Sequence, residues 1–175
     1  AILGALFERS LDPSKRAQIG AHYTSRDDIM LIVEPVLMAP LRRRWEEVQA
    51  EAQALATARD EAKTPRTRDN RNKELASLLL GFAAEIAGVQ VLDPASGSGN
   101  FLYVALQQLL DLEKAVVTLA GDLNVGRFFP SVSPAQLHGI EINPYAHELA
   151  QATVCGSGTF SGCGRTASAS RASRF

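Results

Sequence analysis

Apolar side chains recur at helical spacing along the first half of the chain. Ser25 precedes the first such stretch as an N-cap, and Asp28 is placed to close a capping box. The apolar positions that follow are Ile29, Ile32, Val33, Val36 and Leu37. Pro35 and Pro40 should break or kink this stretch, with Pro40 in the first turn of a further helix.

Two more segments precede the middle of the chain. Residues 41–62 are rich in Ala, Glu and Arg with few large apolar residues, which favours an exposed helix. Residues 64–72 are polar, include Pro65 and an Asp-Asn pair, and are typical of a loop. A strongly amphipathic helix follows and ends at Gly88. Its apolar positions are Leu75, Leu78, Leu79, Phe82 and Ile86.

The pattern changes at residues 89–93, a short β-branched run that predicts a buried strand. A Gly/Ser turn, a helix over about 100–120 and a loop over 121–134 come next. Residues 136–142 predict a second strand, and an Asn-Pro pair begins a helix over 143–154. This order implies a parallel sheet. The predicted fold class is α/β, a partial doubly wound (Rossmann-like) sheet with a helical N-terminal region.

Composition indicates a soluble globular protein: 46% of residues are hydrophobic, 21% are charged and the net charge is −1. The chain therefore has no overall basic bias toward nucleic acid. The basic residues of 42–44 and 59–73 lie among acids and predict a solvated helical face. No apolar run is long enough to span a bilayer, and the histidines lack metal-ligand spacing. We expect a cytoplasmic protein without membrane contact or metal.

A glycine turn follows the first strand, in Asp93-Pro94-Ala95-Ser96-Gly97-Ser98-Gly99-Asn100-Phe101. Such a turn either binds a ligand at the strand end or simply joins strand to helix. A P-loop is disfavoured because Asn100-Phe101 replaces Lys-Ser/Thr, and a nicotinamide site because Leu102 occupies its third glycine position. Asp93 would repel a pyrophosphate. A cationic ligand such as S-adenosylmethionine, with its sulfonium and ammonium groups, would be attracted.

Glu141 ends the second predicted strand. A carboxylate there can accept hydrogen bonds from both hydroxyls of a ribose, each bond contributing about 1.5–3 kcal/mol. The alternative is a solvated acid at a helix start, favoured by the helix dipole. The residue by itself leaves both interpretations open.

Taken together, three motifs resemble the adenine-N6 DNA methyltransferases, most closely the large single-chain restriction–modification enzymes. Residues 93–102 resemble the cofactor motif, with Ser96 where Cys is frequent. Residues 139–144, Gly-Ile-Glu-Ile-Asn-Pro, resemble the ribose-binding motif. Residues 20–25, Gly-Ala-His-Tyr-Thr-Ser, resemble an upstream Gly-x-Tyr-Tyr-Thr-Pro segment, from which His22 and Ser25 depart. The resemblance covers roughly residues 2–154.

The resemblance implies an S-adenosyl-L-methionine site and a role for each matching residue. Asp93 and the turn around Gly97 and Gly99 would hold the methionine end, Glu141 the ribose, and Ile142 the adenine ring. Further implied contacts come from the upstream segment and from the turn and helix start. These residues are Tyr23, Thr24, Ala95, Ser96, Asn100 and Phe101.

The catalytic motif of that family, Asp/Asn-Pro-Pro-Tyr/Phe, does not occur, because the sequence contains no Pro-Pro pair. We therefore expect this chain alone to be inactive and to bind double-stranded DNA weakly or not at all, although DNA would be the partner of a full-length enzyme. A non-catalytic cofactor-binding or interaction module is the alternative function.

Three regions are expected along the chain. Residues 1–88 form a helical N-terminal region and residues 89–154 the start of the cofactor-binding α/β domain. Residues 155–175 contain no Leu, Ile, Val, Asp or Glu, so we expect a disordered tail. Permitted codons for the tail can be chosen so that, read two bases later, they spell an amphipathic continuation of the preceding helix. This suggests that a frameshift near Val154 ended the open reading frame early. Sequencing the gene tests this hypothesis, and a downstream frame without a Pro-Pro-aromatic motif would reject it.

Overall fold

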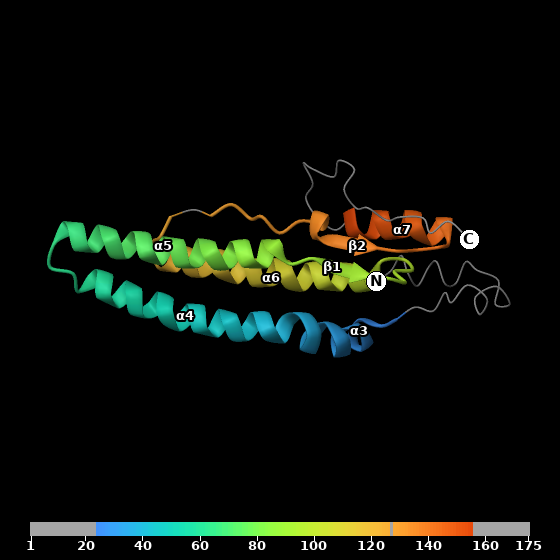
Figure 1. The fold of residues 1–175 in the computed structure, drawn as a ribbon, viewed down its shortest axis with the longest axis horizontal. Coiled ribbons are helices and arrows are strands. Elements are labelled where there is room, and N and C mark those ends of the chain that lie inside the picture. Colours follow the sequence, from blue (N-terminus) through green and yellow to red (C-terminus); the bar gives the residue numbers. More distant parts are fainter. Residues whose placement is uncertain (1–23, 127, 156–175) are drawn as a thin grey trace. The chain divides into compact units, whose positions relative to one another are not determined.

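The computed structural model describes residues 24–126 and 128–155, which are mostly helical with one small parallel sheet (Figure 1). In chain order the elements are α3 (Arg26–Val33), the π-helical segment η1 (Glu34–Met38), α4 (Ala39–Asp60), α5 (Pro65–Gly88), β1 (Val91–Asp93), α6 (Asn100–Asp122), the 3-10 turn η2 (Pro134–Gln136), β2 (Leu137–Gly139) and α7 (Pro144–Cys155). No helix in these ranges is long and apolar enough to cross a membrane.

The chain divides into two compact units. Within the described residues the first, called here the sheet unit, comprises 24–35, 90–107 and 133–155. The second, the hairpin unit, comprises Val36–Val89 and Gln108–Val132. Of the predicted tail, 155–175, residues 156–175 lie outside the described residues, and Cys155 is the last residue of the final helix.

Helix α3 begins where the sequence predicts. Ser25 Oγ accepts a hydrogen bond from Asp28 N at 3.2 Å and donates one to Asp28 Oδ2 at 2.7 Å, which confirms the N-cap. Pro35 falls in η1, where a π-helical turn accommodates a residue that has no N–H to donate and whose ring crowds the preceding turn. Pro40 lies in the first turn of α4, as expected.

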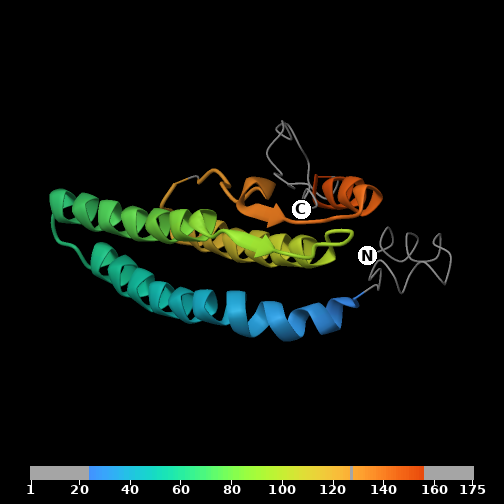
Figure 2. The same cartoon turned by 45° about the vertical axis from the view of Figure 1, so that its right-hand side comes forward.

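Helix α4 is not the wholly exposed helix that its composition suggested. It buries one stripe, made of Leu41, Trp45, Val48, Ala52 and Ala56. The stripe was missed because its second half consists of alanines, which let α5 approach closely without adding a strong apolar signal. Trp45 stacks on Phe82 of α5 with ring centroids 5.3 Å apart, and α4 and α5 lie side by side in Figures 1 and 2.

Helix α5 begins at Pro65, so the prediction of a loop over 64–72 is wrong. Thr64 Oγ1 accepts a hydrogen bond from Thr67 N at 3.2 Å, and Pro65 follows as the first helical residue. This cap and proline pair starts a helix even though the next residues are polar and exposed. The predicted apolar face is otherwise correct, with Leu75, Leu79, Phe82 and Ile86 buried.

Helix α6 carries a buried acid in the hairpin unit. Glu113 is only 3% exposed, and its Oε1 accepts hydrogen bonds from the backbone N–H groups of Ser131 and Val132. The carboxylate therefore ties the end of the loop after α6 back onto the helix. Arg59 of α4 donates to Leu123 O at 2.7 Å and holds the start of the same loop.

Strands β1 and β2 are parallel, as predicted (Figure 2). They pair in the register Val91–Leu137, Leu92–His138 and Asp93–Gly139. Each has three residues, fewer than predicted. The expectation that the first strand is buried is wrong, because the Leu92 side chain is 62% exposed. Within the described chain the sheet has no third strand, which leaves this face without the cover of a larger doubly wound sheet.

Candidate functional site

The turn between β1 and α6 satisfies its own backbone donors. Asp93 Oδ1 accepts from Ala95 N at 3.0 Å, and Ser96 O accepts from Gly99 N at 2.7 Å. Gly97 and Gly99 have φ values of 52° and 81°, in the left-handed region that glycine adopts without the steric cost of a Cβ. The Gly-x-Gly spacing in the sequence is therefore a requirement of this backbone path.

The two glycines of the turn have different surroundings. A Cβ on Gly99 would lie 3.1 Å from both Cα and Cβ of Ala150, so Gly99 packs directly on helix α7. A Cβ on Gly97 would meet no atom within 4 Å. Gly97 thus marks the open side of the turn, where a ligand can approach the backbone.

The turn is fastened to strand β2 by backbone hydrogen bonds. Ser96 N donates to Ile140 O at 3.1 Å, and Ile140 N donates to Asp93 O at 3.0 Å. The Ser96 side chain is buried and its Oγ donates to Ile140 O at 3.4 Å. Gly139 passes directly beneath it, since a Cβ on Gly139 would come within 2.8 Å of Ser96 Oγ.

Glu141 connects the two strand ends through its side chain. Its Oε2 accepts from Gly97 N at 2.8 Å, and its Oε1 accepts from Asn143 N at 2.7 Å. The side chain is half-buried. A carboxylate pointing at solvent from the start of a helix would make neither of these contacts, so the geometry excludes a merely solvated Glu141.

Helix α7 starts directly after this acid. Asn143 Oδ1 accepts from the N–H groups of Tyr145 at 2.9 Å and Ala146 at 3.3 Å, which confirms Asn143 as the N-cap. Ile142, between the acid and the cap, is 68% exposed. Its apolar side chain is therefore open to a ligand directly after Glu141 in the chain.

Helix α6 begins on the other side of the turn with Asn100 and Phe101, both half-buried. Their backbone N–H groups have no acceptor among the described residues, and no acidic side chain stands in the first turn of the helix. Such a helix start favours negatively charged groups of a ligand.

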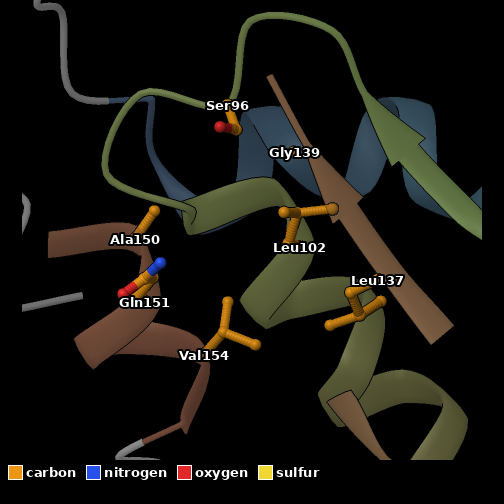
Figure 3. A pocket seen from close by; sticks show the side chains of 7 residues that line it. All are labelled: Ser96, Leu102, Leu137, Gly139, Ala150, Gln151 and Val154. Atoms are coloured by element: carbon orange, nitrogen blue, oxygen red, sulfur yellow. The ribbon is translucent and has the colours of Figure 1, made fainter. Parts of the chain in front are cut away.

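A small cavity lies between α6, α7 and β2, which contribute the side chains of Leu102, Val154 and Leu137 respectively (Figure 3). Its volume is about 20 Å³, enough for a single water molecule. Its lining consists of Ser96, Leu102, Leu137, Gly139, Ala150, Gln151 and Val154. This volume is too small for a nucleoside. The open side of the turn, at Gly97 and Glu141, is the candidate site.

The structure brings the predicted turn and the predicted acid together, and of the upstream segment it describes only Thr24 and Ser25. Tyr23 lies outside the described residues. Thr24 directly precedes the N-cap of α3, and no hydrogen bond within the described residues joins it to the turn. The roles given to these two residues by the family resemblance therefore stay predictions.

Two residues that shape the site were given no role from the sequence. Gly139 is needed because strand β2 passes under Ser96, and Ala150 because α7 packs on Gly99. Gly139 could have been recognised from the sequence, because it is a glycine two positions before an acid at a strand end. Ala150 is only a small residue inside a helix, and such residues are too common to predict a contact from the sequence.

Comparison with known proteins identifies the family of the chain. Residues 65–158, more than half of the sequence, match the family described as the MmeI DNA-methyltransferase domain. The chain belongs to this family. The match covers the turn, Glu141 and helix α7.

Two relatives and one solved structure agree with this assignment. DNA methyltransferase A of Bacillus subtilis (strain 168) is 28% identical over 87% of this chain and 15% of its own length. A Methanocaldococcus jannaschii protein described as a type II restriction enzyme and methyltransferase is 26% identical over 86% of this chain and 13% of its own. The type IIL restriction–modification enzyme MmeI, solved in complex with DNA, matches with a TM-score of 0.61 and 27% identity. That alignment covers 88% of this chain and 18% of MmeI. The chain thus spans less than a fifth of each of these proteins.

Proposed function

We propose that the open side of the β1–α6 turn binds S-adenosyl-L-methionine, and that the chain is the cofactor-binding part of an adenine-N6 DNA methyltransferase of a restriction–modification system. The observation that carries the proposal is the 2.8 Å hydrogen bond between Gly97 N and Glu141 Oε2. This contact supports the proposal, because one small molecule can then reach both the glycine turn and Glu141, the acid proposed to bind the ribose.

The charges around the turn fit a cationic nucleoside. Asp93 uses Oδ1 to hold Ala95 N, and its Oδ2 has no hydrogen-bond partner among the described residues. That oxygen is available to the ammonium group of the methionine end. A pyrophosphate would meet both Asp93 and Glu141, and two unit charges of like sign about 4 Å apart repel by roughly 1–4 kcal/mol near a protein surface.

The remaining parts of the cofactor have matching surfaces. The free N–H groups of Asn100 and Phe101 at the start of α6 suit the methionine carboxylate. The exposed Ile142 offers an apolar surface to the adenine ring beside the ribose acid. Gly97 leaves the space between these groups free of a Cβ.

The larger context of the proposal comes from the family. The two-stranded unit would be the beginning of a doubly wound methyltransferase sheet. Double-stranded DNA would be the partner of the whole enzyme, and the solved MmeI structure is a complex with DNA. The 175-residue sequence contains no Pro-Pro-aromatic motif to hold a target adenine. We propose that transfer requires such residues in addition to those of this chain.

Calorimetric titration of the chain with S-adenosylhomocysteine and with NAD tests the cofactor. We expect saturable binding of the first and none of the second. Glu141→Ala should weaken binding at least about tenfold, because charge-assisted hydrogen bonds to the ribose contribute about 1.5–3 kcal/mol each. Glu148→Ala, which removes an exposed acid from α7, is the matched control and should bind as the parent does. Binding of NAD instead, or loss of affinity in both variants alike, would contradict the proposal.

A further inference from the structure

Three consecutive N–H groups of the turn point to three different acceptors. Ala95 N donates to Asp93 Oδ1 and Ser96 N to Ile140 O, both close to the strand pair. Gly97 N, the third, donates to Glu141 Oε2. The first two bonds connect the turn to the strand ends, so the outermost part of the turn depends on the side chain of Glu141.

From this arrangement we propose that Glu141 is a positioning residue for the glycine turn, and that it keeps this contact while the cofactor is bound. The inference rests on the proposed function for its second half only. The first half, that the carboxylate holds Gly97 in place, concerns the ligand-free chain.

The hydrogen-bonding capacity of a carboxylate makes both roles compatible. Its two oxygens offer about four acceptor positions, and the N–H groups of Gly97 and Asn143 use one on each oxygen. One position per oxygen is left, which matches the two neighbouring hydroxyls of a ribose. The backbone bonds at the same time fix the orientation of the carboxylate, so little side-chain freedom is lost when the ribose binds.

The position of Gly97 explains why this contact matters. Its φ is 52°, and apart from its two chain neighbours no atom lies within 4 Å of where its Cβ would be. No packing contact at that point can replace the hydrogen bond. Without Glu141, the part of the turn nearest the ligand would lose its tertiary anchor.

Amide hydrogen exchange of the full 175-residue chain, measured by NMR, tests the first half. In the parent, Gly97 N and Asn143 N should be protected. In Glu141→Gln, one of these amides faces an NH₂ donor, and in Glu141→Ala both lose their acceptor. Exchange at the affected amides should rise at least about tenfold, while amides within α6 and α7 keep their rates. Glu148→Gln should change neither amide.

Titration with S-adenosylhomocysteine, followed at the same amides, tests the second half. Gly97 should stay protected as the chain saturates. An unprotected Gly97 in the ligand-free parent would overturn the inference, as would binding that exposes Gly97, and the latter result would leave the proposed function intact. A protected Gly97 in a chain that does not bind the nucleoside would instead overturn the proposed function and support the positioning role.

Discussion

Replacing Gly139 by alanine gives the sharpest stability test of the site. The added Cβ would lie 2.8 Å from Ser96 Oγ, 3.0 Å from Ser96 Cβ and 3.2 Å from Leu102 Cδ1, where ordinary contacts begin at 3.4 Å. Ser96 cannot yield easily, because its backbone N–H is bonded to Ile140 O and its short side chain has no flexible end. Overpacking of this kind costs about 1–3 kcal/mol, and a weakened backbone hydrogen bond adds about 1 kcal/mol.

Gly81→Ala is the matched control for the same chemical change. Gly81 lies inside α5 and a Cβ there meets nothing within 4 Å, so alanine should stabilise the helix by about 0.5–1 kcal/mol. Urea unfolding followed by circular dichroism, with amide exchange at Ser96 as a local probe, measures both variants. In a Ser96→Gly background the cost of Gly139→Ala should shrink, because the two closest of the three atoms, Ser96 Oγ and Cβ, are gone. A Gly139→Ala chain as stable as the parent would refute the reasoning.

Three further predictions follow from the same contacts. Gly99→Ala should destabilise the chain more than Gly97→Ala in urea unfolding, since both adopt positive φ but only Gly99 also meets Ala150; equal losses would contradict this. Glu113→Ala should lower the free energy of unfolding by about 1–3 kcal/mol, because the N–H groups of Ser131 and Val132 lose their acceptor. Replacing the exposed Glu61 by alanine should leave the free energy of unfolding almost unchanged, and equal losses in the two variants would contradict the prediction. The 175-residue chain should transfer no radiolabelled methyl group from S-adenosylmethionine to unmethylated double-stranded DNA, and incorporation above a heat-denatured control would disprove this.

The parts of the fold that depend on local signals were predictable. Ser25 and Asn143 act as N-caps whose side chains bond N–H groups two or three residues ahead, so the sequence alone locates them. The turn around Gly97 is equally local, because positive φ values favour glycine. The meeting of Glu141 with this turn was suggested by the family motifs and by the parallel order of the strands.

The parts of the fold that depend on contacts between residues distant in the sequence were not predictable. The buried stripe of α4 ends in Ala52 and Ala56, whose burial follows from the close approach of α5 and not from their own hydrophobicity. Leu92 looks like a core residue in the sequence, yet its exposure depends on how many strands the sheet has. Residues 65–72 form a helix because Thr64 and Pro65 start one, although their polarity is typical of a loop.

The contact between Gly99 and Ala150 also restricts how such sequences can diverge. With 3.1 Å between the would-be Cβ and the helix backbone, a larger side chain at either position would force α7 away from the turn and shift Glu141 with it. Related genes should therefore keep glycine at the first position and a small residue at the second. This pair would serve as a marker for members of the family whose other motifs have drifted beyond recognition.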